Sequence, residues 1–362
     1  MEGAGQRSGG IAILERRASL IRSLVKGTKS MNTAMNILVR ALLFAVFLQF
    51  APFGMAQASQ DATDDPIIRI NVELVQVDAQ VLEKKTGRPV DSLGKEDFLL
   101  YEDGVRQQIA EMSQNQLPLS VVLMFDLTFT VRPVLKPLAA GALQALQHLK
   151  PEDEVAVMVY AASAQVLQDF TTDREQVVAA IEKASEMESN QEAFFNEAVF
   201  QASAQLGKAK NPRSRRTIIW LTDNVPNIPS SKQHSEQEAY REVFETGTVV
   251  SALVERSGLS DFFNVTFRKN PIFAAFRMHD PPGNVYKYAE RTGGAVMTSS
   301  REEVSVKLAQ LIDEIRTRYT LGYYPSVKQP KGKFCEIRLR NSLEVQKRKG
   351  PLLVRTKQGY YR

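Results

Sequence analysis

The sequence predicts an α/β fold in which a doubly wound, mostly parallel six-stranded sheet is inserted into, or flanked by, a small antiparallel β-sandwich. Residues 121–125 are five apolar side chains without a polar break, which is typical of a strand buried on both faces of a parallel sheet. From Pro118 to about residue 318, strand patterns alternate with amphipathic helix patterns, as in α/β domains. The segments 67–113 and 319–362 contain only short β patterns.

The α/β region is expected to contain six strands and six helices. The strands are expected at 119–125, 154–160, 164–170, 217–222, 248–254 and 295–298. The helices are expected at 134–149, 173–187, 193–207, 235–246, 284–292 and 301–318. The turn at 161–163 is too short for a crossover helix, so strand 164–170 should run antiparallel at an edge. A capping box from Thr172 to Glu175 should open the second helix, and Gly247 should end the fourth.

The flanking segments are expected to form one β domain together. Residues 68–82 alternate between apolar and polar with one slip near Leu74, which indicates a bulge. Strands at 98–101 and 105–112 surround an Asp103-Gly104 hairpin turn, and further strands are expected at 320–324, 334–339 and 352–354. Because each flank alone has too few strands to bury a face, we expect a shared sandwich, with two separate β modules as the alternative.

The first 58 residues resemble a leader for export. Residues 37–53 are almost wholly apolar, and Ala56-Gln57-Ala58 matches a signal-peptidase site, so a periplasmic or secreted protein is expected. The alternative is an uncleaved N-terminal membrane anchor, which would be the only contact with a membrane. We therefore divide the chain into a leader at 1–58 (31–58 if translation starts at Met31), a linker at 59–66, β segments at 67–116 and 319–362, and the α/β domain at 117–318.

Charge and cysteine content exclude two further possibilities. The net charge of +5 disappears once the seven basic and two acidic residues of the leader are set aside, so nothing indicates nucleic-acid binding. Cys335 is the only cysteine, so no intrachain disulfide forms.

Polar residues follow two of the expected strands at their carboxyl ends. Asp126, Thr128 and Thr130 come directly after strand 119–125, and Asp223 follows strand 217–222. Open α/β sheets bind ligands at this edge, and oxygen ligands of this kind suit a hard cation such as Mg²⁺ rather than zinc or copper. The plainer reading is a strand that ends in a polar turn.

These motifs carry a family resemblance. Asp-x-Thr-x-Thr after a buried strand, a later Leu-Thr-Asp and the strand–helix order resemble the von Willebrand factor A fold over about residues 117–318. The flanking stretches Leu-Glu-Lys-Lys-Thr-Gly-Arg-Pro-Val at 82–90, Tyr-Thr-Leu-Gly-Tyr-Tyr-Pro at 319–325 and Gly-Tyr-Tyr at 359–361 are similar to an exported bacterial "VWFA-related domain" family.

The resemblance implies a metal-ion-dependent adhesion site (MIDAS) for Mg²⁺, Mn²⁺ or Ca²⁺, completed by an acidic side chain of a protein partner. Its ligands would be Asp126, Thr128, Thr130 and Asp223. The second loop departs from the family pattern, because Ala193 stands where a threonine ligand is usual, and the neighbouring Glu192 is the candidate replacement. The site is thus expected to be weakened, rebuilt with Glu192, or vestigial.

The function expected is non-enzymatic protein binding of the adhesion type, without a small-molecule substrate. The main alternative is a structural or assembly subunit whose metal site is degenerate. A Mg²⁺-dependent phosphatase is a remote alternative, because Thr128 stands where such an enzyme has its acidic general acid.

A long segment at 256–283 leaves the same edge of the sheet. It carries several phenylalanines, and Phe262, Phe263 and Phe267 are candidate partner-binding residues, since aromatic side chains concentrate at interface centres. The alternative is that they pack beneath the loop itself.

Overall fold

The computed structural model describes residues 74–114, 117–225, 231–255 and 284–362. All described residues belong to one compact unit, Ile70–Arg362. The expected leader, linker and first half of strand 68–82 lie outside the described residues, as do Phe262, Phe263 and Phe267. Among the described residues, no helix combines the length and the apolar character needed to span a bilayer.

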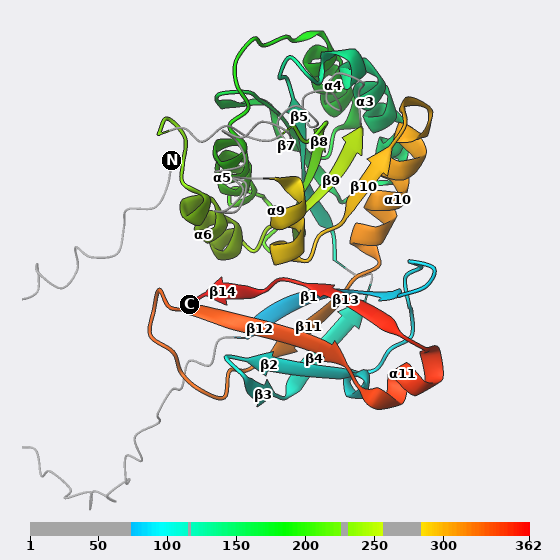
Figure 1. Ribbon diagram of the computed structural model, residues 1–362, viewed down its shortest axis with the longest axis vertical. Helices are drawn as coiled ribbons and strands as arrows, with labels where there is room; N and C mark the ends of the chain where they lie inside the picture. Colours follow the sequence, from blue (N-terminus) through cyan, green and yellow to red (C-terminus); the bar gives the residue numbers. More distant parts are fainter. Residues whose placement is uncertain (1–73, 115–116, 226–230, 256–283) are drawn as a thin grey trace, which may run out of the picture. The chain divides into compact units, whose positions relative to one another are not determined.

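The α/β domain is built on a six-stranded sheet with the strand order β10-β9-β8-β5-β6-β7 (Figure 1). The strands are β5 (Leu119–Asp126), β6 (Glu154–Tyr160), β7 (Ala164–Thr171), β8 (Arg215–Thr222), β9 (Val249–Glu255) and β10 (Val296–Ser299). All neighbours run parallel except β7, which pairs antiparallel with β6 at the edge. This mostly parallel sheet is the one that the sequence predicts.

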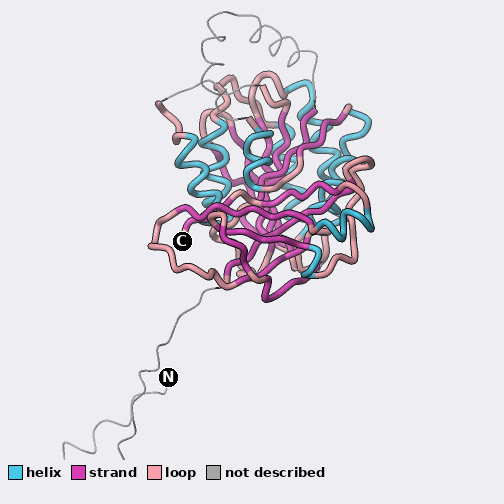
Figure 2. Tube along the Cα trace, turned by 60° about the horizontal axis from the view of Figure 1, so that its bottom comes forward, coloured by secondary structure: helices cyan, strands magenta, loops and turns pink. Residues whose placement is uncertain are grey.

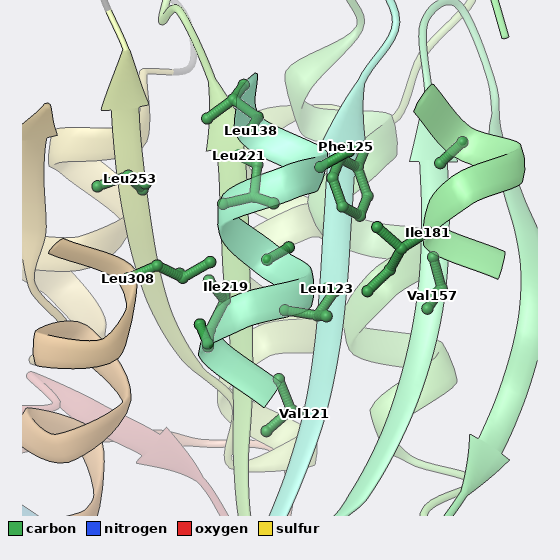
Figure 3. Close-up of a cluster of buried hydrophobic side chains, with 14 of the residues drawn as sticks. Val121, Leu123, Phe125, Leu138, Val157, Ile181, Ile219, Leu221, Leu253 and Leu308 are labelled. Atoms are coloured by element: carbon green, nitrogen blue, oxygen red, sulfur yellow. The ribbon is translucent and has the colours of Figure 1, made fainter. Parts of the chain in front are cut away.

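Helices cover both faces of the sheet (Figure 1). One layer contains α3 (Arg132–Ala145), α4 (Arg174–Glu186) and α10 (Val304–Arg316). The other contains α5 (Phe195–Leu206), α6 (Glu236–Thr246) and α9 (Val285–Thr292). All eight residues of β5 are buried, because alternate side chains face opposite layers. Leu123 and Phe125 pack with Leu138 and Ile181 in the first layer (Figure 3), whereas Met124 packs in the second.

The helix ends agree in part with the capping signals in the sequence. Ser235 and Glu238 form a capping box before α6, and Gly247 ends that helix in the left-handed conformation at φ 69°. The expected cap at Thr172 is wrong by one residue. The side chain of Asp173 instead accepts hydrogen bonds from the backbone of Glu175 and Gln176, so α4 starts at Arg174.

Strands from both flanks pair with each other in the β domain, which consists mainly of strands (Figure 2). One sheet has the order β13-β1-β11-β4, and the other has the order β14-β12-β2-β3. The early strands are β1 (Val75–Glu83), β2 (Phe98–Glu102), β3 (Val105–Gln107) and β4 (Ile109–Gln114). The late strands are β11 (Tyr319–Tyr323), β12 (Phe334–Asn341), β13 (Leu352–Thr356) and β14 (Gly359–Tyr361). The predicted fold class, a mostly parallel six-stranded sheet flanked by antiparallel β structure, is therefore confirmed.

Two details of the β domain differ from the expectation. The run at 105–112 is not one strand, because it divides at Gln108 into β3, which pairs with β2, and β4, which pairs with β11 in the other sheet. A short helix, α11 (Leu343–Lys349), capped by the Ser342 side chain, also connects β12 to β13. The expected hairpin turn is present, with Asp103 at φ 47° and Gly104 at φ 82°, both in the left-handed region that such a turn requires.

The β domain and the α/β domain share a buried arginine. The Arg215 guanidinium donates hydrogen bonds to Asp78 on β1 (3.1 Å) and Thr320 on β11 (3.0 Å). It also donates to the backbone carbonyl groups at the end of α10 and just beyond it. All five N–H donors of this side chain are used, so Arg215 satisfies carbonyl groups that would otherwise be buried unpaired.

Candidate functional site

The candidate site lies at the carboxyl ends of β5 and β8, which are parallel neighbours in the centre of the sheet. Phe125 pairs in register with Leu221, so the strands end at the same level. Asp126 is the last residue of β5, and Asp223 follows immediately after β8. The structure therefore brings together two carboxylates that are nearly a hundred residues apart in the sequence.

The Asp126 carboxylate is buried and accepts four hydrogen bonds. Oδ1 accepts from the backbone N–H of Thr128 (2.9 Å) and from its hydroxyl (2.6 Å). Oδ2 accepts from the Tyr160 hydroxyl (2.7 Å) and the Thr222 hydroxyl (2.7 Å). Two donors at each oxygen use most of the acceptor capacity of a carboxylate. Asp126 is thus placed to orient the surrounding hydroxyl groups.

The two threonines of the first loop lie beside this carboxylate. Their hydroxyl oxygens are 3.5 Å apart, and the side chains of Thr128 and Thr130 are both buried. Because the Thr128 hydroxyl donates its proton to Asp126, its oxygen lone pairs remain available as acceptors.

Asp223 is buried, and its carboxylate is stabilised by a hydrogen bond with the Thr130 side chain and by one from its own loop. Oδ1 accepts a hydrogen bond from the backbone N–H of Val225 (3.2 Å), whereas Oδ2 has no hydrogen-bond partner among the described residues. The chain turns at once after Asp223, where Asn224 adopts φ 54° and donates its N–H to the Thr222 hydroxyl (3.0 Å). A buried carboxylate oxygen without a donor is costly unless a proton or a cation compensates it.

The electrostatics of the two carboxylates agree with this geometry. Burial raises the pKa of Asp126 above its ordinary value. Burial, together with the negative charge of Asp126, raises the pKa of Asp223 to about 7. Two buried carboxylates in mutual repulsion resist simultaneous ionisation. The pair therefore favours either a proton on one of the two carboxylates or a bound cation.

The donor set is composed of oxygen atoms. In the described part of the chain, no three His, Cys, Asp or Glu side chains cluster in a way that could hold a metal ion. An ion at this edge would have to use the hydroxyls of Thr128 and Thr130 together with Asp223 Oδ2. Neutral hydroxyls and a carboxylate are suitable ligands for a hard divalent cation and poor ones for a soft metal.

The second loop contributes less than the family pattern requires. Ala193 has no donor atom and packs against the hydrophobic layer that contains α5. Glu192 is exposed and makes no hydrogen bond or ion pair with any described residue. The helix that follows begins at Phe195, two residues later than expected. The structure thus gives no contact that places Glu192 in the site.

Tyr160 and Thr222 are site residues that the sequence analysis missed. Each ends a strand adjacent to β5, and each donates to Asp126 Oδ2. Tyr160 in turn accepts a hydrogen bond from Trp220 Nε1 (3.0 Å), which connects the site to an aromatic cluster in the core. Their position at the carboxyl ends of neighbouring strands was the available signal, although both residues otherwise resemble core side chains.

Comparisons with known proteins agree with the fold. The family model of the von Willebrand factor type A domain matches residues 121–225, which include Asp126 and Asp223. A search of curated proteins finds no match.

Several solved structures are similar to the chain. BatB from Bacteroides thetaiotaomicron is 17% identical, with 54% of this chain and 98% of that chain covered and a TM-score of 0.38. A von Willebrand factor type A protein from Catenulispora acidiphila is 10% identical, with 75% and 70% covered and a TM-score of 0.41. Proximal thread matrix protein 1 from the mussel byssus, described with a zinc-occupied MIDAS motif, is 12% identical, with 56% and 49% covered and a TM-score of 0.39. These likenesses are distant, so the assignment rests on the family model. Residues 121–225 therefore match the von Willebrand factor type A domain, and the likeness holds for that part of the chain.

Proposed function

We propose that the α/β domain binds another protein through a divalent cation held between the ends of β5 and β8. The observation that carries this proposal is the buried pair of carboxylates, in which Asp223 Oδ2 has no hydrogen-bond partner among the described residues and two threonine hydroxyls lie nearby. A cation of the Mg²⁺, Mn²⁺ or Ca²⁺ type would offset the repulsion between the two carboxylates.

The four residues would have unequal roles. The hydroxyls of Thr128 and Thr130 and the free oxygen of Asp223 would contact the ion. Asp126 would not contact the ion directly, because its oxygens already accept four hydrogen bonds. One of these bonds would orient the Thr128 hydroxyl toward the ion. With so few protein ligands, the ion would retain open coordination positions. A carboxylate of the partner would occupy one of them, because a bound cation is often the largest local charge in a site.

The proposal is for binding without catalysis. Thr128 stands where a phosphatase of the aspartate type would need a second acid, and a threonine hydroxyl cannot act as general acid near neutral pH. The other polar side chains in contact with Asp126 are Tyr160 and Thr222, and burial holds the pKa of Tyr160 well above its ordinary value. A generic phosphate-ester assay tests the remote enzymatic alternative.

The main rival function is that of a structural or assembly subunit that uses no metal. Ala193 favours it, because the second loop supplies no ligand from that position. The raised pKa of Asp223 also allows a proton to take the place of a cation. In this case the partner contacts would run through the β domain.

Metal dependence separates the two functions. We would titrate Mg²⁺ and Mn²⁺ into the purified protein by calorimetry and compare Asp223→Asn and Thr128→Val with Asp313→Asn. The last is a matched acid-to-amide change at an exposed position on α10. Saturable binding in the wild type and Asp313→Asn, lost in the two site variants, supports the cation site. Absence of binding up to about millimolar concentrations contradicts it.

A capture experiment tests the function itself. The protein is used as bait for the envelope fraction with Mg²⁺ or with EDTA, and each bait variant is compared with the wild type. A partner that is lost both on chelation and in Asp223→Asn supports metal-bridged binding. A partner that is retained in both cases supports the structural alternative.

We also propose export to the periplasm or the cell exterior, on the basis of the apolar run at 37–53 and the Ala-Gln-Ala sequence that follows it. Mass spectrometry of the mature protein should give Ser59 as the first residue. An intact N-terminus in a membrane fraction would instead indicate an anchor.

A further inference from the structure

Phe129 is an exposed aromatic residue in the loop that carries the candidate cation ligands Thr128 and Thr130. It lies between Thr128 and Thr130, whose side chains are buried, and 50% of its own surface is exposed. The other phenylalanines whose burial the structure describes are buried or half-buried. Large apolar side chains exposed beside a polar site are candidates for partner contacts, because aromatic residues dominate the energetics of interfaces.

The Phe129 ring is held by a side chain that is itself fixed. The guanidinium of Arg132 lies 5.4 Å from the ring centroid. Its Nη2 donates hydrogen bonds to the carbonyl of Ser189 (3.2 Å) and to Asn190 Oδ1 (2.6 Å), and it lies 3.6 Å from the Glu188 carboxylate. These contacts connect the first loop of the site to the second. A ring supported in this way loses little conformational entropy when a partner covers it.

We infer that Phe129 and the cation site form one docking surface for an extended segment of another protein, which places an acidic side chain on the cation and a large apolar side chain on Phe129. This inference rests on the proposed function. Phe129 is the chain neighbour of both Thr128 and Thr130, and neighbouring Cα atoms are about 3.8 Å apart. The Phe129 Cα therefore lies about 3.8 Å from the Cα atom of each threonine. In an extended segment, side chains two residues apart face the same side at about 6.7 Å. The expected partner motif is therefore an acidic residue with a large apolar residue two positions away.

The charges around the ring favour an apolar rather than a basic contact. Arg132 already supplies a cation to this ring, so a second cation would meet its positive charge. An aliphatic or aromatic side chain meets no such repulsion and gains from the burial of the exposed part of the ring.

The test selects 12-residue peptides from a random displayed library on the immobilised full chain in Mn²⁺ and in EDTA. The baits are the wild type, Phe129→Ser, Phe129→Leu and the control Leu343→Ser, which removes an exposed apolar residue of α11 in the β domain. Melting temperatures and Mn²⁺ titrations of each bait show whether the fold and the metal site are intact.

The expected result is Mn²⁺-dependent enrichment of an acidic residue with a large apolar residue two positions away, on the wild type and Leu343→Ser. Phe129→Ser should retain Mn²⁺ binding and the acidic preference, lose the apolar preference, and bind the best wild-type peptide about 30-fold more weakly. Phe129→Leu should give an intermediate affinity.

Two kinds of result overturn the inference, and they can be distinguished by whether Mn²⁺ binds. If acidic residues are enriched without an apolar neighbour, if basic residues replace the apolar ones, or if Mn²⁺ binds but no peptide is enriched, then Phe129 is not a docking residue while the cation site stands. If Mn²⁺ does not bind to the wild type, the proposed function fails, and the inference fails with it.

Discussion

Replacing Asp223 by asparagine should stabilise the protein in the absence of metal, although it destroys a proposed ligand. The pKa of Asp223 is raised to about 7 in the folded state from an ordinary value of 3.8, chiefly by burial and next by the charge of Asp126. Above that pKa the fold must hold two buried negative charges. Asparagine has nearly the same shape as the neutral acid and removes one of these charges.

The size of the effect follows from the shift in pKa. A difference of about three pH units corresponds to about 4 kcal/mol at about pH 8, where wild-type Asp223 is ionised in both the folded and the unfolded state. For a protein of this size, 4 kcal/mol raises the melting temperature by about 7 °C.

The sign of the pH dependence is fixed by the same shift. Because the folded state holds the proton more tightly, stability is greatest below the unfolded pKa of 3.8 and is lost as the pH rises towards 7. Wild-type protein should therefore be about 3 kcal/mol more stable at about pH 5 than at about pH 8, apart from contributions of other groups. Asp223→Asn should lack this component of the pH dependence.

Thermal melts monitored by circular dichroism in EDTA measure both effects, with Asp313→Asn as the control for an exposed carboxylate. Adding Mg²⁺ at about pH 8 should raise the melting temperature of the wild type and leave that of Asp223→Asn unchanged, because ligands stabilise only the state that they bind. If Asp223→Asn melts at or below the wild-type temperature in EDTA at about pH 8, the buried charge of Asp223 does not destabilise the folded state.

Three further substitutions test separate contacts. Tyr160→Phe removes a donor to Asp126 and the acceptor of Trp220 Nε1, so urea unfolding should show a loss of about 1–3 kcal/mol, whereas the exposed Tyr286→Phe should change little. Arg215→Met leaves Asp78 and several carbonyl groups unpaired, so it should lower the free energy of unfolding by about 3–5 kcal/mol in the same assay. The control is Arg241→Met, which removes an exposed ion pair with Glu245. A loss for Arg215→Met no larger than that of the control would contradict this prediction. Glu192→Gln should leave the Mg²⁺ affinity within about twofold of the wild type, because Glu192 is exposed without a partner among the described residues; a large loss would show that Glu192 is a ligand.

The sequence was informative where one physical requirement decided the structure. In an uninterrupted apolar strand, side chains on both faces must be removed from water, so both faces must be buried. The strand β5 and its central position in the sheet could therefore be predicted. The carboxyl ends of parallel strands meet at one edge, so the approach of Asp223 to Asp126 could be predicted as well. The resemblance to a known family then suggested which oxygens would face a cation.

Sequence reasoning was less successful where several local solutions have similar energies. Thr172 and Asp173 are both good helix caps, and the choice between them depends on how the chain leaves β7. The run from Val105 to Met112 contains no Gly, Pro, Asn, Asp or Ser, so no turn residue marks the change of sheet at Gln108. Tyr160 resembles a core residue until the position of its hydroxyl is known. The roles proposed for Phe262, Phe263 and Phe267 remain predictions, since these residues lie outside the described part of the chain.

A crystal of the protein grown with Mn²⁺ and measured at the manganese absorption edge gives the most direct test of the cation site. We expect one strong anomalous peak between β5 and β8, about 2 Å from the hydroxyl oxygens of Thr128 and Thr130 and on the side of the free oxygen of Asp223. A map without a peak at this position, in crystals that contain Mn²⁺ at about millimolar concentration, would contradict the site and the binding function proposed for it.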